Sequence, residues 1–203
     1  MQSVKPVLFV AGFGRCGTTL IMTMLDRGGF PVAGSRPAFE EDEMSPITGV
    51  NKAWVKAQAG KAVKWIDPLR ARISRNDLPR APVIILMERD VREQARSSVK
   101  MVEASGAAIG NRNMVRAMTR SFRRDQPILR ARLSTLGTVH RFAFEQVLRD
   151  PRGAAAMLGA IAKVEFDHDL DEAMAASMVL PRDPECQPDF AIEHALQEFA
   201  QHG

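Results

Sequence analysis

An apolar run, a glycine-rich loop and a helical segment follow one another near the start of the chain. The run covers 7–11, the loop reads Gly12-Phe-Gly-Arg-Cys-Gly-Thr-Thr19, and 20–25 has a helical pattern. A strand that ends in a glycine-rich turn before a helix directs backbone N–H groups and the positive helix end toward an anion. Glycine lets the backbone approach a phosphate closely, and Thr18 and Thr19 add hydroxyl donors. The loop therefore predicts a phosphate-binding turn at the end of the first strand.

The loop departs from the P-loop of nucleotide hydrolases at one position. That motif reads G-x-x-x-x-G-K-[ST], and Thr18 stands where it carries its lysine. The only cation in the loop is Arg15, three residues upstream. No convincing Asp for Mg²⁺ follows a strand, although Asp90 lies near one, so the pattern is poorly suited to γ-phosphate transfer. A P-loop nucleotide kinase or NTPase is kept as the alternative interpretation, and we expect no metal.

The same loop resembles the 5′-phosphosulfate-binding loop of sulfotransferases, which is commonly written Arg or Lys, Ser, Gly, Thr, Thr. This chain has Arg15-Cys-Gly-Thr-Thr19, with Cys16 in place of the serine. The resemblance implies that the chain binds 3′-phosphoadenosine 5′-phosphosulfate as a sulfuryl donor. The donor-binding residues that it implies in the loop are Gly14, Arg15, Cys16, Gly17, Thr18 and Thr19.

A second stretch agrees with this resemblance. The apolar run 83–87 is typical of a buried parallel strand and ends in Glu88-Arg89-Asp90 before a helical segment. Ser97 follows Arg89 by eight positions. Sulfotransferases carry an arginine and a serine at this spacing, which together hold the 3′-phosphate of the donor. A guanidinium suits that role because it can bind a phosphate through two hydrogen bonds.

A third stretch matches the family in a less specific way. Residues 137–144 have the pattern of a strand, and Glu145-Gln-Val-Leu-Arg-Asp-Pro151 is interpreted as a turn before an alanine-rich helix that reaches about Lys163. Sulfotransferases typically show a strand, such a turn, Asp-Pro, and a helix that ends near Leu-Gly. The three matching stretches lie in family order and span residues 7 to about 163.

Sulfuryl transfer needs a group that stabilises the departing phosphate and a base that takes the acceptor proton. Arg15 is the candidate for the first role, through preorganised electrostatic stabilisation. Many soluble sulfotransferases place a histidine after the strand preceding the 3′-phosphate strand, but 63–68 contains none. Glycan-modifying relatives use a glutamate after the second strand, where this chain has Glu40-Glu41-Asp42-Glu43. Glu40 or Glu41 is therefore the leading candidate for the base and Asp67 the second, although a solvated acidic loop explains the carboxylates equally well.

Apolar runs and helical patterns alternate along the whole chain. We expect strands at 7–11, near 30–33, 62–66, 83–88 and 138–143, and helices at 18–28, near 49–59, 91–104, 111–135, 151–163 and 169–178. This alternation predicts an α/β fold, a three-layer sandwich with a central, mainly parallel sheet like that of P-loop NTPases. We expect one domain over 1–203, with a proline-rich linker from about 181 and a terminal helix at 191–201.

The composition narrows the function classes. The chain is 45% hydrophobic and 26% charged, which is ordinary for a soluble globular protein. No stretch has the roughly 18 consecutive apolar residues that a membrane helix needs. The chain enters its first strand without a signal sequence, and its two cysteines, Cys16 and Cys186, form no disulfide framework. We therefore expect a cytoplasmic protein.

The net charge of +4 comes mainly from arginine, and arginines crowd 112–132 among apolar residues at helical spacing. We interpret this segment as an amphipathic helix with a solvated basic face, the alternative being an anion-attracting wall beside the donor. With no tyrosine and 6% aromatic residues, nucleic-acid binding is not expected. The expected partner is a small-molecule or glycan acceptor. A nucleotide-binding pseudoenzyme of this fold stays open, because the loop serine and the histidine are missing.

Overall fold

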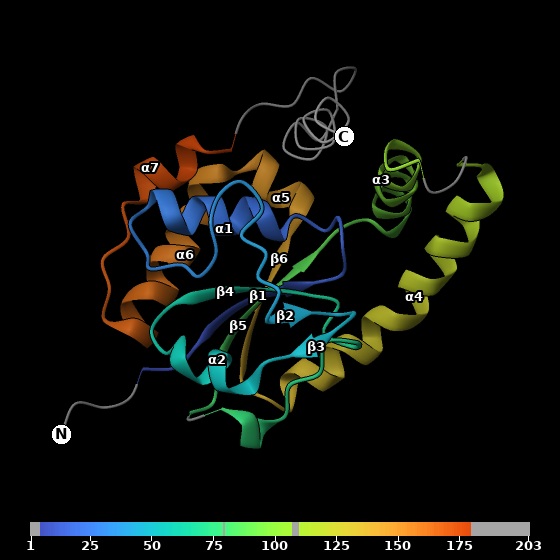
Figure 1. Cartoon of the computed structure of the whole chain (residues 1–203). Helices are drawn as coiled ribbons and strands as arrows, with labels where there is room; N and C mark the ends of the chain where they lie inside the picture. The colour runs from blue at the N-terminus through green and yellow to red at the C-terminus, as the bar shows by residue number, and fades with distance from the viewer. Residues whose placement is uncertain (1–4, 79, 107–109, 180–203) are drawn as a thin grey trace, which may run out of the picture.

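A four-stranded parallel sheet forms the centre of the computed structural model, which describes residues 5–78, 80–106 and 110–179. The strand order is β4-β1-β5-β6 (Figure 1). The strands are β1 (Leu8–Gly12), β4 (Ala62–Ile66), β5 (Val83–Glu88) and β6 (Thr138–Ala143). All three pairings between them are parallel, so the carboxyl ends of the strands meet at one edge. The predicted α/β class with a parallel sheet is confirmed.

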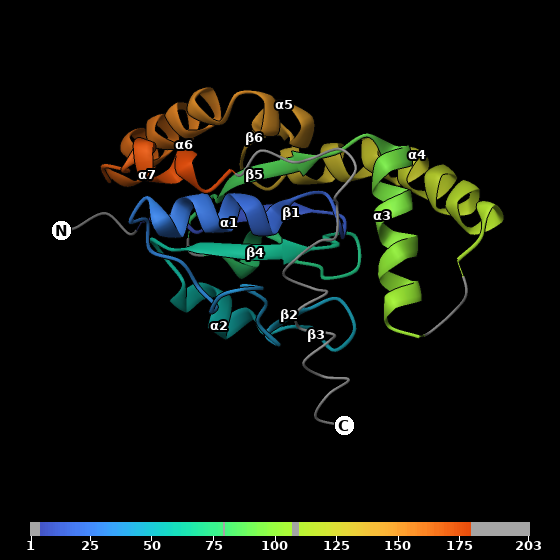
Figure 2. The same ribbon diagram turned by 90° about the horizontal axis from the view of Figure 1, so that it is seen from above.

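Helices cover both faces of this sheet, and Figure 2 looks onto one face, with β4, β1, β5 and β6 side by side. One face carries α1 (Thr18–Arg27), α5 (Phe144–Arg149), α6 (Pro151–Phe166) and α7 (Glu172–Ser177). The other carries α2 (Lys52–Ala57) and the second half of α4 (Arg112–Ser134), while α3 (Val91–Ala104) packs against α4. Because side chains alternate along a strand, Leu8 and Val10 pack on the first face and Phe9 and Ala11 on the second.

The strands and long helices lie close to their predicted positions, but several shorter segments differ from the prediction. The segment near 30–33 forms only a single bridge, between Val32 and Ala62, instead of a strand. Residues 144–149 form α5 and not a turn, because Phe144 and Val147, three positions apart, are both buried on the sheet. The segment 169–178 contributes a helix only over Glu172–Ser177, which Asp171 caps.

A small hairpin replaces the start of the helix that was predicted near 49–59. It consists of β2 (Met44–Ser45) and β3 (Gly49–Val50), with Gly49 at a φ of 98°. The helix α2 begins only at Lys52, after the Asn51 side chain accepts a hydrogen bond from the Trp54 amide. Residues 68–78 hold one short 3-10 helix, Arg75–Asp77.

The basic segment forms one continuous helix, α4, which passes through Pro127. Leu129 and Leu133 are its buried residues, and its arginines lie mainly on the outside. Arg130 reaches back to Glu88 at the end of β5, where Arg141 of β6 binds the same carboxylate. The predicted linker and terminal helix after residue 180 lie outside the described residues.

Gly12, where β1 turns into the loop, allows a direct test of packing at the strand end. We expect Gly12→Ala to lower the free energy of unfolding by about 1–3 kcal/mol, the usual cost of overpacking. A Cβ there would lie 2.9 Å from the Met87 carbonyl oxygen and against the Cys16 side chain. Gly14→Ala is the matched control, since a Cβ at Gly14 meets no atom within 4 Å. Urea unfolding should leave this control within about 1 kcal/mol of wild type, and an equal loss in both variants would contradict the packing argument.

Candidate functional site

The glycine-rich loop joins the carboxyl end of β1 to the first turn of α1. Gly17 precedes the helix at a φ of 103°, and Arg15 has a φ of 68°. Residues with a side chain rarely adopt such φ values, which favours glycine at position 17. A Cβ on Gly17 would also meet the Phe144 ring. The N-cap residue of α1 is Gly17, which makes no side-chain cap, so the positive end of the helix faces the loop. An anion is the ligand that such a turn favours.

A pocket of about 300 Å³ opens over this loop. Its walls come from the loop, the ends of β4 and β5, α3 and α5. The lining residues are Gly14, Arg15, Gly17, Thr18, Thr19, Leu20, Glu40, Lys64, Ile66, Arg89, Met101 and Phe144. The structure thus brings most of the predicted donor-binding residues to one cavity, together with one predicted catalytic carboxylate. Of the predicted donor-binding set, Cys16 and Ser97 are not lining residues.

Hydrogen bonds tie the loop to the two residues predicted to bind the 3′-phosphate. The Arg15 Nε donates to Ser97 Oγ over 3.1 Å, and the Arg89 Nη1 donates to the Arg15 carbonyl oxygen over 3.2 Å. Gln94 of α3 also donates to the Gly14 carbonyl oxygen, at 2.8 Å. Residues separated by some 80 positions in sequence therefore form one polar group around the loop.

Arg89 is held in place by an aromatic ring. Its guanidinium carbon lies 4.7 Å from the centre of the Phe144 ring, a cation–π arrangement. The same ring fills the space beside Gly17 that a side chain would need. The Nε of Arg89 is buried and has no hydrogen-bond partner among the described residues. A buried guanidinium N–H without a partner is costly, and an anion in the pocket would satisfy it.

Lys64 is the charged pocket residue that was not predicted from the sequence. It lies in β4 between Val63 and Trp65, which point to the opposite face of the sheet. Its side chain is 3% exposed, and its Nζ donates to the Thr19 hydroxyl, the Ala38 carbonyl oxygen and the Glu40 carboxylate. A single charge within an otherwise apolar strand was the available signal, because a buried lysine needs partners.

Cys16, at the position where sulfotransferase loops commonly have serine, does not line the pocket. It is 1% exposed, and burial raises the pKa of its thiol to about 12. The thiolate is the reactive form of cysteine, so this side chain acts as a small apolar residue near neutral pH. Its contribution is to pack the loop between β1 and β5, where it would touch any side chain placed at Gly12.

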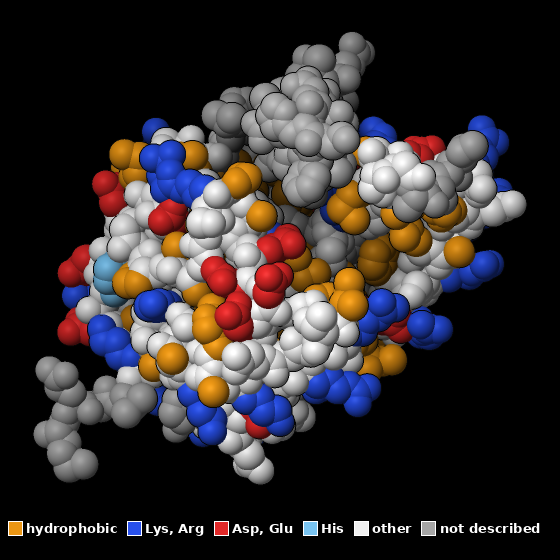
Figure 3. Space-filling model, in the orientation of Figure 1, with side chains coloured by type: hydrophobic (Ala, Val, Ile, Leu, Met, Phe, Trp, Pro, Cys, Tyr) orange, Lys and Arg blue, Asp and Glu red, His pale blue; other side chains and the backbone are white. Residues whose placement is uncertain are grey.

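The three candidate bases lie in different surroundings. Glu40 lines the pocket through its ion pair with Lys64, whereas Glu41 and Asp67 are not lining residues. Asp67 follows β4 at a φ of 51°, and its backbone N–H donates to the Gly12 carbonyl oxygen over 2.9 Å. Burial raises the pKa of the Asp67 carboxyl, and the Arg70 guanidinium acts in the opposite direction. Figure 3 shows acidic side chains gathered in the middle of one face, over the segment that leads into β2.

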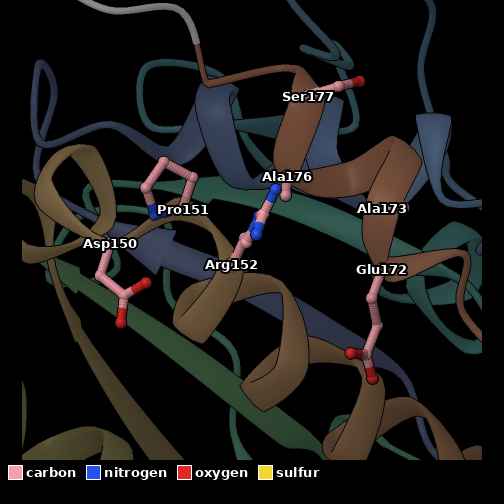
Figure 4. Close-up of a pocket in the computed structure, with 7 residues that line it drawn as sticks. All are labelled: Asp150, Pro151, Arg152, Glu172, Ala173, Ala176 and Ser177. Atoms are coloured by element: carbon pink, nitrogen blue, oxygen red, sulfur yellow. The ribbon is translucent and has the colours of Figure 1, made fainter.

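A larger pocket of about 730 Å³ lies away from the loop, between the starts of α6 and α7 (Figure 4). Asp150, Arg152 and Glu172 line it together with small residues. None of the predicted site residues reaches it. Within the part of the chain that the structure describes, no group of three or more His, Cys, Asp and Glu side chains is arranged to hold a metal ion. No helix in that part is long and apolar enough to cross a membrane.

Comparison with solved structures finds the same architecture in a sulfotransferase from Alicyclobacillus acidocaldarius. The likeness has a TM-score of 0.56 and covers 98% of this chain and 93% of that chain, with 16% of residues identical. No protein-family model matches the chain, and no curated protein sequence does. The fold is sulfotransferase-like. At this level of identity the comparison establishes the fold and leaves the reaction to be argued from the pocket.

Proposed function

We propose that this chain is a sulfotransferase, which moves a sulfuryl group from 3′-phosphoadenosine 5′-phosphosulfate to a hydroxyl or amine acceptor. The observation that carries the proposal is the convergence of the loop and Arg89 on one pocket, with Ser97 hydrogen-bonded to Arg15 beside it. They were identified from separate stretches of sequence, and parallel strand ends bring them together. The similarity of the whole fold to a solved sulfotransferase supports the same conclusion.

The pocket residues fit a donor with two anionic groups. The loop amides and the Thr18 and Thr19 hydroxyls would hold the phosphosulfate end, since they surround the uncapped start of α1. Arg89, with its buried and unpartnered Nε, would hold the 3′-phosphate together with Ser97. A γ-phosphate donor fits less well, because the loop has threonine in place of the P-loop lysine.

In the proposed transfer the protein mainly stabilises charge and accepts a proton. The donor supplies an activated sulfuryl group: the acceptor oxygen or nitrogen bonds to sulfur while the bond from sulfur to the bridging phosphate oxygen breaks. The electron pair of the broken bond stays on that oxygen, and Arg15 and Lys64 provide the positive charge that stabilises it. Glu40, the candidate carboxylate that lines the pocket, takes the acceptor proton.

The acceptor is proposed to be a small molecule or a glycan. Its group must reach both the sulfuryl end of the donor and Glu40, which is 60% exposed and so stands at the open side of the pocket. Met101 and Ile66 add apolar surface to the same cavity.

The proposed function is tested by ligand selectivity followed by a transfer assay. We expect 3′,5′-adenosine bisphosphate to raise the melting temperature of the protein, while Mg-ATP at the same concentration has little effect. Transfer of labelled sulfate from the donor to a panel of phenols, amines and glycans should then be detectable. Stabilisation by Mg-ATP with ATP turnover would assign the chain to the kinase or NTPase class. Nucleotide binding without transfer to any acceptor would favour a pseudoenzyme.

Arg89→Ala should weaken binding of 3′,5′-adenosine bisphosphate by about 10- to 100-fold, because a charge-assisted hydrogen bond contributes about 1.5–3 kcal/mol. Affinity for adenosine 5′-phosphate, which lacks the 3′-phosphate, should change little. Arg92→Ala is the matched control, since Arg92 is an exposed arginine in the first turn of α3. Calorimetric titration of both nucleotides measures the difference, and an equal loss for the two would show that Arg89 does not bind the 3′-phosphate.

Arg15→Ala should lower the turnover number by about 10²–10³-fold, the effect of removing one donor that stabilises transition-state charge. Affinity for the spent nucleotide should fall far less, since that interaction strengthens mainly as the bond to sulfur breaks. Arg15→Lys should keep part of the activity because it retains the charge. Turnover, affinity and melting temperature are measured on the same three proteins. If stability and affinity fall together without a separate loss of turnover, Arg15 only fastens the loop to Ser97.

A further inference from the structure

Every hydrogen-bonding position of the Lys64 ammonium group is already used inside the protein. The three acceptors are Thr19 Oγ1 at 2.9 Å, the Ala38 carbonyl oxygen at 2.6 Å and Glu40 Oε1 at 2.8 Å. An ammonium group has three N–H donors, so this set saturates it. An anion that binds at Thr19 can therefore gain a bond from Lys64 only if one of the present acceptors leaves.

Glu40 is the acceptor that an anion would displace. It alone of the three carries a negative charge, so an anion at the loop repels it while attracting Lys64. Its side chain is 60% exposed, and water can solvate the carboxylate after it leaves. The Thr19 hydroxyl and the Ala38 carbonyl group are neutral and gain no such repulsion.

We infer that Lys64 is an anion-binding residue of the loop pocket and that Glu40 is its internal counter-ion, which competes with the phosphosulfate end of the donor. Donor binding then replaces one anion on Lys64 by another and releases the Glu40 carboxylate at the wall of the pocket. This inference rests on the proposed function for the identity of the donor. The exchange of two anions on Lys64 itself would be the same for any phosphate or sulfate that binds at the loop.

The exchange of anions on Lys64 places donor binding before the removal of the acceptor proton. While Glu40 is paired with Lys64, one oxygen of its carboxylate is engaged by the ammonium group. Once an anion has taken its place, the carboxylate is free and has lost its neighbouring cation. Donor binding therefore frees the whole carboxylate to face the acceptor before the proton is removed. The two residues of this exchange, Lys64 in β4 and Glu40, both lie outside the loop motif.

The test measures anion affinity and needs no sulfate transfer. Inorganic pyrophosphate and 3′,5′-adenosine bisphosphate are titrated into wild type and Glu40→Gln by calorimetry. Removing the competing charge should tighten both ligands by about 3- to 10-fold, the scale of a partly exposed ion pair. Asp42→Asn is the matched control, because it removes an equal charge from an exposed position in the same segment. It should change either affinity by less than about 2-fold.

The double variant Lys64→Met with Glu40→Gln completes the cycle. Lys64→Met should weaken both ligands, and Glu40→Gln should have no further effect in that background. The inference is overturned if Glu40→Gln weakens binding or leaves it unchanged, if Asp42→Asn tightens it equally, or if the gain persists without Lys64. Pyrophosphate separates this outcome from the proposed function: tighter pyrophosphate binding supports the exchange even if no variant distinguishes a 3′-phosphate.

Discussion

The parallel pairing of β1 with β4 and β5 is the constraint on which the site depends. Parallel strands end at the same edge of a sheet, so the loop after Gly12, the charge in β4 and the arginine after β5 are brought together by the ladder itself. Side-chain alternation then directs Lys64 toward α1, while its neighbours Val63 and Trp65 pack on the other face. A shift of one residue in the register would reverse that direction.

The loop depends on close packing as much as on hydrogen bonds. Phe144 occupies the space beside Gly17 and lies under the Arg89 guanidinium, so one ring both requires a glycine and orients a cation. Cys16 fills the space behind Gly12 and is too buried to act as a nucleophile. A cysteine at the position where sulfotransferase loops commonly have serine is therefore compatible with a packing role.

The distribution of charge around the pocket suits an anion, although the loop has no lysine of its own. Arg15, Lys64 and Arg89 come from the loop, β4 and the end of β5, and all three line the same cavity. In a P-loop nucleotide hydrolase one lysine of the motif serves the phosphates. Here the nearest equivalent to that lysine in the pocket comes from another strand and binds the second threonine of the loop. Its ion pair with Glu40 balances the buried charge.

The sequence alone determined the α/β class, the four sheet strands and the glycine-rich turn before the first helix, because apolar runs, helical periodicity and glycine spacing are local properties of the chain. It also indicated Arg89 and Ser97, through a spacing along one strand and helix. Only the tertiary structure decided that Lys64 belongs to the site and that Glu40 rather than Glu41 or Asp67 lines the pocket. Both depend on contacts between segments far apart in sequence. The role of a lysine in an apolar strand follows from its hydrogen-bond partners, which only the folded structure brings together.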